Sequence, residues 1–86
     1  MEVTPSYYGL SSRIQLEEIG KNHLGLRKVI KSRIIRKDAK KILEIAEQIR
    51  NVVPEMEITL ICTRNICSKS LALLHENGVE VRYCEV

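Results

Sequence analysis

The stretch RKVIKSRIIRKDAKK, from Arg27 to Lys41, holds most of the positive charge of this 86-residue chain. It contains eight of the fourteen basic residues and a single acid, Asp38. Because the whole chain has a formal net charge of +3, the residues outside the stretch carry a net charge of −4. Within the stretch, the apolar spacing changes from that of a strand to that of a helix. Its basic residues are Arg27, Lys28, Lys31, Arg33, Arg36, Lys37, Lys40 and Lys41.

The residues before the stretch predict an irregular arm followed by a β-hairpin. Residues 1–12 show no apolar period, so we expect an irregular N-terminal arm there. From Arg13 onward, apolar and polar residues alternate, which indicates a half-buried strand. The turn Gly20-Lys21-Asn22 supplies residues that tolerate positive φ. The return strand would place Leu24, Leu26, Ile30 and Ile34 on one face, and Arg27, Val29, Lys31 and Arg33 on the other.

The later residues predict the order α-β-α-β. Apolar residues at three- and four-residue spacing from Ile35 onward indicate a helix that Pro54 ends, with either Ser32 or Asp38 as its N-cap. Residues 57–63, EITLICT, are nearly all apolar and predict a strand covered on both faces. A second helix is expected over 66–77, closed by Asn77-Gly78, and a half-exposed strand over 79–84.

The order β-β-α-β-α-β predicts one small α/β domain over residues 13–86, at the border with the α+β class. Each strand-helix-strand succession favours parallel pairing through a right-handed crossover. We therefore expect a mixed four-stranded sheet with an N-terminal hairpin and two helices packed on it. The hairpin register stays open, because pairing Leu16 with Leu26 or Ile14 with Ile30 keeps the apolar faces together.

The composition favours a cytoplasmic protein with reduced thiols. No apolar run approaches the ~20 residues of a membrane span, and MEVTPSYYG lacks the basic and apolar regions of a signal peptide. The cysteines Cys62, Cys67 and Cys84 are odd in number and lack a disulfide-framework spacing. Together with His23 and His75 they show no zinc-ligand spacing, so we expect neither a metal nor another cofactor.

The basic stretch predicts a surface that binds nucleic acid or another polyanion without catalysis. Lys37, Lys40 and Lys41 lie in the opening turns of the expected helix, where the dipole disfavours each cation by ~0.3–1 kcal/mol. Cations that lower the stability of a helix start, with no local interaction to offset the loss, indicate a functional role. On the expected strand, Arg27, Lys31 and Arg33 would step by ~13 and ~6.6 Å, comparable to two and one phosphate intervals. The predicted binding residues are Arg27, Lys31, Arg33, Arg36, Lys37, Lys40 and Lys41, and the alternative is an ordinary solvated face.

The turn CTRNICSKS, from Cys62 to Ser70, is a second candidate, either as a small-anion site or as an enzyme site. It joins a buried parallel strand to a helix, which is where ligands gather in open α/β sheets. Free N–H groups at the helix start, with Cys67, Ser68, Lys69 and Ser70, would hold an anion. The helix dipole would make the Cys67 thiol more acidic.

Two other interpretations stay open. In the first, the turn is purely structural: Thr63 or Asn65 caps the helix and the cysteines fill space. In the second, the chain is a protein-interaction or homodimerisation module, in which the final strand or the hairpin edge pairs with another chain.

The order of elements resembles the later half of the restriction-endonuclease-like nuclease fold. The hairpin, the segment VIKSR, a helix, a buried strand and a helix leading to GVEV carry the resemblance over residues 13–86. That family holds magnesium with an acid on one strand and Glu-x-Lys on the next, so Lys31 would match the lysine and Glu17 or Glu18 the first acid. Val29 stands where the family has an acid. The resemblance therefore implies an inactive relative that keeps a surface for nucleic acid.

Overall fold

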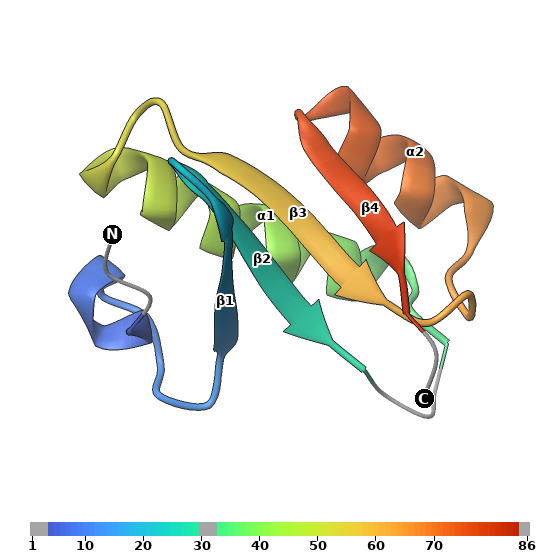
Figure 1. Ribbon diagram of the computed structural model, residues 1–86. Helices are drawn as coiled ribbons and strands as arrows, with labels where there is room; N and C mark the ends of the chain where they lie inside the picture. The colour runs from blue at the N-terminus through green and yellow to red at the C-terminus, as the bar shows by residue number, and fades with distance from the viewer. Residues whose placement is uncertain (1–3, 30–32, 85–86) are drawn as a thin grey trace.

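The computed structural model describes residues 4–29 and 33–84, which form one mixed sheet with two helices (Figure 1). The predicted α/β class and the order β-β-α-β-α-β are confirmed, with a short 3₁₀ helix in the arm. No helix in these ranges is both long and apolar enough to cross a membrane. The elements are η1 (Pro5–Tyr8), β1 (Gln15–Gly20), β2 (His23–Lys28), α1 (Arg36–Val52), β3 (Glu57–Cys62), α2 (Ser68–Glu76) and β4 (Val79–Tyr83).

The strands lie side by side in chain order, β1-β2-β3-β4. β1 pairs antiparallel with β2, and Leu16 stands opposite Leu26, which is one of the two registers that the sequence left open. β2, β3 and β4 are parallel to one another. Right-handed crossovers between neighbouring strands in this order place both helices on the same face. Figure 1 shows α1 and α2 on one side of the sheet.

The hydrophobic core lies between the sheet and the two helices. It consists of aliphatic side chains from every layer, together with Tyr8 of the arm, which is buried against them. Its largest buried members are Leu24 of β2, Ile58 and Leu60 of β3, Val79 of β4, Ile42 and Ile49 of α1, Leu74 of α2, and Ile34 of the connection before α1.

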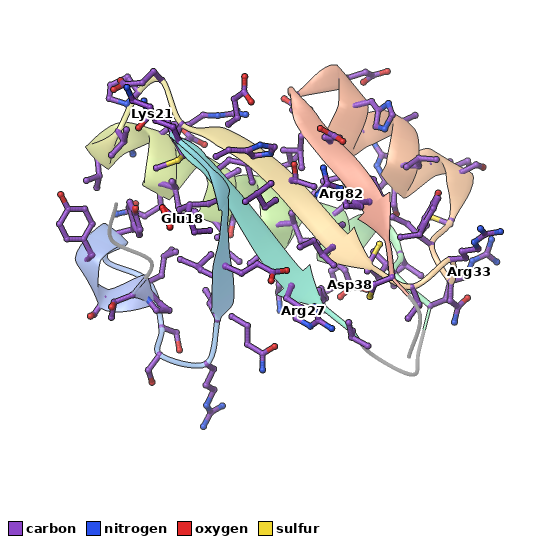
Figure 2. All side chains as sticks on the ribbon, in the orientation of Figure 1. Glu18, Lys21, Arg27, Arg33, Asp38 and Arg82 are labelled. Carbon is purple, nitrogen blue, oxygen red and sulfur yellow. The ribbon has the colours of Figure 1, made fainter. Side chains whose placement is uncertain are left out.

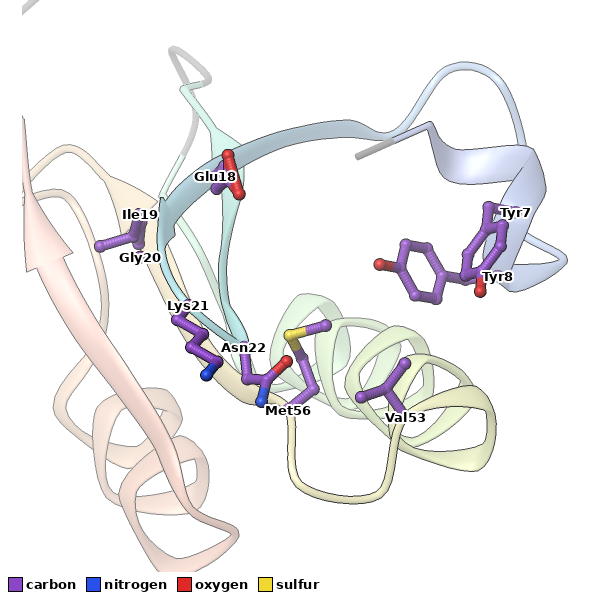
Figure 3. A pocket seen from close by; sticks show the side chains of 9 residues that line it. All are labelled: Tyr7, Tyr8, Glu18, Ile19, Gly20, Lys21, Asn22, Val53 and Met56. Carbon is purple, nitrogen blue, oxygen red and sulfur yellow. The ribbon is translucent and has the colours of Figure 1, made fainter. Parts of the chain in front are cut away.

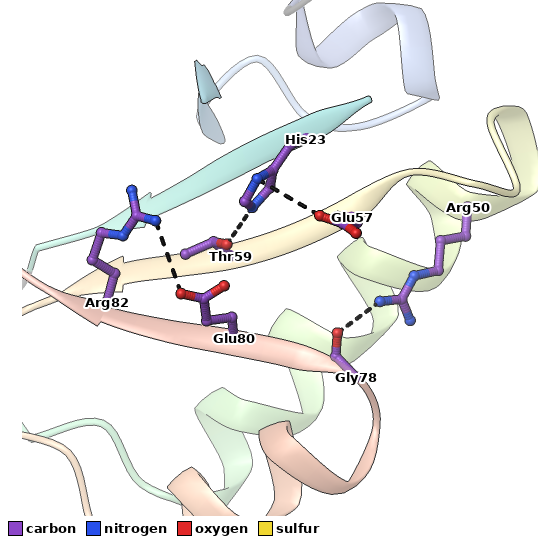
Figure 4. Close-up of polar contacts among 7 residues, drawn as sticks. All are labelled: His23, Arg50, Glu57, Thr59, Gly78, Glu80 and Arg82. Carbon is purple, nitrogen blue, oxygen red and sulfur yellow. Dashed lines mark hydrogen bonds and ion pairs between the residues drawn. The ribbon is translucent and has the colours of Figure 1, made fainter. Parts of the chain in front are cut away.

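β3 is buried on both faces, as predicted, although helices cover only one of them. Thr59 and Ile61 point to the other face, and Thr59 is 0% exposed. The Thr59 hydroxyl lies 2.6 Å from Nε2 of His23, whose Nδ1 is 3.8 Å from Glu57 (Figure 4). A Cβ on Gly25 would come within 2.7 Å of the Ile61 Cδ1. Side chains of neighbouring strands therefore exclude water from this face of β3.

α1 begins at Arg36 with Ile35 as its N-cap residue, so neither Ser32 nor Asp38 is the N-cap. Asp38 acts from inside the first turn instead, where its carboxylate accepts the Ile35 N–H at 3.1 Å. The helix starts no earlier because Ile34 pairs with the chain before α2, which keeps this segment extended.

The return strand is shorter than predicted. β2 ends at Lys28, opposite Cys62 at the end of β3, so β3 offers no further strand to pair with. Arg33 therefore lies outside β2, and it does not share a strand face with Arg27. Residues 30–32 lie outside the described ranges.

The ends of the two helices are tied together by Arg50. Its guanidinium donates to the carbonyls of Asn77 at 3.2 Å and Gly78 at 3.0 Å (Figure 4). Asn77 is the C-cap of α2, and Gly78 follows it with φ +75°, so the predicted Asn77-Gly78 closure is confirmed. The bonds from Arg50 satisfy carbonyls that the end of α2 leaves free.

Replacing Ile49 by alanine is expected to lower the free energy of unfolding by about 2–5 kcal/mol, because Ile49 is fully buried between α1 and the sheet. Ile35→Ala is the control: that side chain is 50% exposed, and its loss should change stability by less than ~0.5 kcal/mol. Urea unfolding measures both values. Equal effects of the two substitutions would contradict the packing of α1 described above.

Candidate anion-binding edge of the sheet

Two connections that are far apart in the sequence meet at the carboxyl end of the parallel strands. Ile34, between β2 and α1, forms an isolated parallel bridge with Ile66, between β3 and α2. The Ile34 N–H donates to the Asn65 carbonyl at 2.9 Å, and the Cys67 N–H donates to the Ile34 carbonyl at 3.0 Å. The basic stretch and the turn Cys62–Ser70, predicted as separate candidates, therefore lie side by side.

Both helices begin at this edge, two residues after the bridge. Their free N–H groups and the positive ends of their dipoles therefore lie at the same end of the sheet (Figure 1). Figure 2 shows the side chain of Arg33 beyond the ends of β3 and β4. The exposed basic residues of the two connections and helix starts, called the carboxyl-edge cations below, are Arg33, Arg36, Lys37, Arg64 and Lys69.

Cys67 is the N-cap of α2, so neither Thr63 nor Asn65, the caps of the structural interpretation, holds that position. The Cys67 Sγ accepts the Ser70 N–H at 3.4 Å and lies 2.8 Å from the Ser70 hydroxyl. These hydrogen bonds from Ser70 lower the pKa of the Cys67 thiol, and the positive charge of Arg33 adds to the effect.

The same contacts limit what the turn offers to an outside anion. Ser70 is fully buried, and both its N–H and its hydroxyl are bonded to Cys67. Of the four residues predicted for a small-anion site, only Ser68 and Lys69 are exposed. The thiolate itself would be the anion that this helix start stabilises.

The other two cysteines lie at the same edge. Cys62 is fully buried at the end of β3, and the Cys84 N–H donates to its carbonyl at 2.8 Å. Burial raises the pKa of the Cys62 thiol to about 11, and the neighbouring Cys84 contributes to the rise. All three cysteines are free thiols. Within residues 4–29 and 33–84, no three His, Cys, Asp or Glu side chains are arranged to hold a metal ion.

The basic residues predicted on the helix point away from the core. Arg36, Lys37 and Lys40 are exposed and lie opposite the buried side of α1. Lys41 is also exposed, but it turns toward the hairpin, where it lines a hollow together with Arg13. Lys31, which was predicted with them, lies outside the described residues.

Arg27 is separated from the helical cations by the sheet. It follows the core-facing Leu26, so its side chain projects to the face without helices. There its Nη1 lies 3.7 Å from a carboxylate oxygen of Glu17. Glu80 pairs with Arg82 at 3.8 Å on the same face (Figure 4). This face therefore carries mixed charge, and the predicted basic surface is divided between two sides of the domain.

Two hollows lie beside β1, one near each of its ends. The larger, of about 640 Å³, lies between the arm, the hairpin turn and the end of α1 (Figure 3). Tyr7, Tyr8 and Met56 line it together with the charged residues Glu18 and Lys21. The smaller, of about 320 Å³, lies at the start of β1 against the first half of α1.

Sequence reasoning missed two basic residues that belong with the candidates. Arg64 lies in the turn Cys62–Ser70, and its position after a parallel strand could have marked it as a candidate binding residue. Its guanidinium lies 5.8 Å from the ring centre of Tyr83. Arg13 lines the smaller hollow, and only the tertiary structure brings it near Lys41.

Comparison with protein-family models, curated proteins and solved structures finds no match to this chain.

Replacing Lys37 by glutamate is expected to raise the free energy of unfolding by about 0.3–1 kcal/mol. Lys37 is the second residue of α1, where the helix dipole disfavours a cation and favours an anion. Lys21→Glu makes the same charge change in the hairpin turn, beside the hollow at the end of α1, and should not raise the free energy of unfolding. Thermal and urea unfolding measure both. A loss of stability in Lys37→Glu would contradict the assigned helix start.

Alkylation of Cys67 is expected to reach its half-maximal rate at a lower pH than for an ordinary thiol, because its folded pKa is lowered. Ser70→Ala should move this midpoint to higher pH, since Ser70 supplies the main stabilising bonds. Ser68→Ala, which removes an exposed hydroxyl, should leave it unchanged. Mass spectrometry of the labelled peptides separates Cys67 from Cys62, which should stay slow. Equal midpoints in the two serine variants would contradict the capping role of Cys67.

Proposed function

We propose that the protein binds a polyanion, nucleic acid in the first place, through the carboxyl-edge cations and Lys40, and does so without catalysis. The observation that carries the proposal is the bridge between Ile34 and Ile66. It sets the starts of two helices next to each other, so that two dipoles and the basic side chains of two connections contribute to one positive field.

The cations of this surface are available to a partner. Three ion pairs are found among the described residues, and all three lie on the sheet face without helices. None of them uses a carboxyl-edge cation. Asp38 is the acid of the first turn of α1, and its carboxylate is bonded to the Ile35 N–H. Phosphate oxygens would therefore meet basic side chains that have no competing carboxylate within ion-pair distance in the described part of the chain.

Recognition of phosphates is better supported than recognition of bases. Tyr83 is the exposed aromatic residue at this edge, at 44% exposure, and Arg64 lies over its ring. Tyr7 is exposed at the opposite end of the domain. One aromatic ring beside a group of cations is far from the row of stacking side chains that single-strand binding uses. Phosphate contacts carry little sequence information, so we expect weak sequence preference.

The restriction-endonuclease-like resemblance is consistent with such a surface but adds no catalysis to it. Glu17, one of the two matched acids, is paired with Arg27 in the structure. Val29, at the position where that family has an acid, supplies no metal ligand. The proposal is therefore one of binding alone.

Binding of a fluorescent DNA duplex is expected to weaken steeply with salt, with a slope of log K against log salt of about −0.9 for each phosphate neutralised. Replacing Lys37 by glutamate should reduce this slope by about one and lower affinity equally for unrelated sequences. The same substitution is expected to raise stability, so a loss of binding would not be attributed to unfolding. Fluorescence anisotropy across a salt series measures the effect.

The matched control is Lys21→Glu, which has the same charge change at the opposite end of the domain (Figure 2). It should retain the slope of the unmodified protein. Equal losses in the two variants would show that binding follows net charge rather than this surface. Absence of binding at low salt would refute the proposed function.

A further inference from the structure

β1 is the edge strand next to β2, and neither helix covers it fully (Figure 1). Leu16 faces the core side of β1 but is only half-buried as a result. The hollow at the start of this strand has a volume of about 320 Å³. That is near the lower end of the ~300–1,000 Å³ typical of small-molecule pockets.

The lining of this hollow combines an apolar floor with a basic rim. Leu26 of β2 and Ile42 of α1 are buried at its base, and Ile14 and Ile45 flank them half-buried. The polar lining is almost entirely cationic, and no described carboxylate belongs to it. The basic residues of the rim are Arg13, Lys28 and Lys41. Arg27 also lines the hollow, but its side chain projects to the other face of the sheet, toward Glu17.

The charge of the rim is not compensated by ion pairs among the described residues. Glu17 pairs with Arg27 at 3.7 Å, but on the outer side of the sheet. Arg13, Lys28 and Lys41 form no ion pair with any residue of the described ranges. Like charges gathered around one hollow repel one another, and an anion placed among them removes this repulsion. The hollow is therefore complementary to a ligand with one negative end and one apolar end.

We propose that this hollow binds a single small organic anion with an apolar chain, of the class of medium-chain fatty carboxylates. The carboxylate would lie between Arg13, Lys28 and Lys41, where its oxygens accept charge-assisted hydrogen bonds. The chain would lie on Ile42 and Ile45 and displace water from them. A phosphate backbone would leave this apolar floor unused. The inference thus goes beyond polyanion binding and does not rest on it.

The test is a calorimetric titration of the whole chain with octanoate, below the concentration at which octanoate forms micelles. Saturable one-to-one binding is expected, with chemical-shift changes at the methyl groups of Ile14, Ile42 and Ile45. Octan-1-ol has a chain of the same length without the charge. Its affinity should be lower than that of octanoate by about tenfold or more. Lys41→Gln and Arg13→Gln should each weaken octanoate binding by about threefold to tenfold.

Lys21→Gln is the matched control and should leave octanoate binding unchanged, because Lys21 lines the other hollow. Lys37→Glu should impair DNA binding while octanoate binding stays within about twofold of the unmodified protein. The two proposals can therefore fail separately. Equal affinity for octanoate and octan-1-ol, or unchanged affinity in Lys41→Gln, would overturn this inference. Binding to phosphatidylserine vesicles without saturable binding of free octanoate would also overturn it.

Discussion

The handedness of the strand connections is the constraint on which the rest of this structure depends. β2, β3 and β4 are parallel neighbours in chain order, and a right-handed crossover between such neighbours always passes over the same face. Both helices therefore pack on one side, and the other side of the sheet has only side chains to cover it. The same constraint returns the start of each helix to the carboxyl end of the strands. This constraint explains the sheet face without helices, the neighbouring starts of the two helices and the partly covered edge strand.

Charged residues are arranged differently on the sheet face without helices and at the carboxyl end of the strands. On the open face, acids and bases alternate across neighbouring strands, and pairs such as Glu17 with Arg27 cover the sheet without creating a strong field. At the carboxyl end, Arg36 and Lys37 occupy the first turn of α1 against the helix dipole. Asp38 offsets part of this cost through its bond to the Ile35 N–H. A destabilising arrangement at the point where two connections meet supports the proposed binding of anions.

The position of β1 explains why both hollows lie beside it. A helix that packs over the middle of a four-stranded sheet leaves an outer strand partly uncovered, and Tyr7 and Tyr8 of the arm line the larger hollow across from the end of β1 (Figure 3). The smaller hollow gathers Arg13 and Lys41 from segments that show no relation in the sequence. Its basic rim is therefore a product of the packing of α1 against the hairpin, as is the separation of Lys41 from Lys37 and Lys40.

The amino-acid sequence by itself determined the element order, the parallel crossovers, the closure of α2 at Asn77-Gly78 and the burial of β3, because each depends on local periodicity and turn chemistry. It also located the two segments that form the carboxyl edge. Only the tertiary structure decided that these segments meet, since the bridge between Ile34 and Ile66 joins residues whose separation no local pattern encodes. That bridge also kept the segment before α1 extended as far as Ile35, which is the N-cap in place of a better capping residue. The basic stretch is divided between two faces because β2 ends at Lys28, opposite the last residue of β3. The later cations therefore follow the helix instead of the strand.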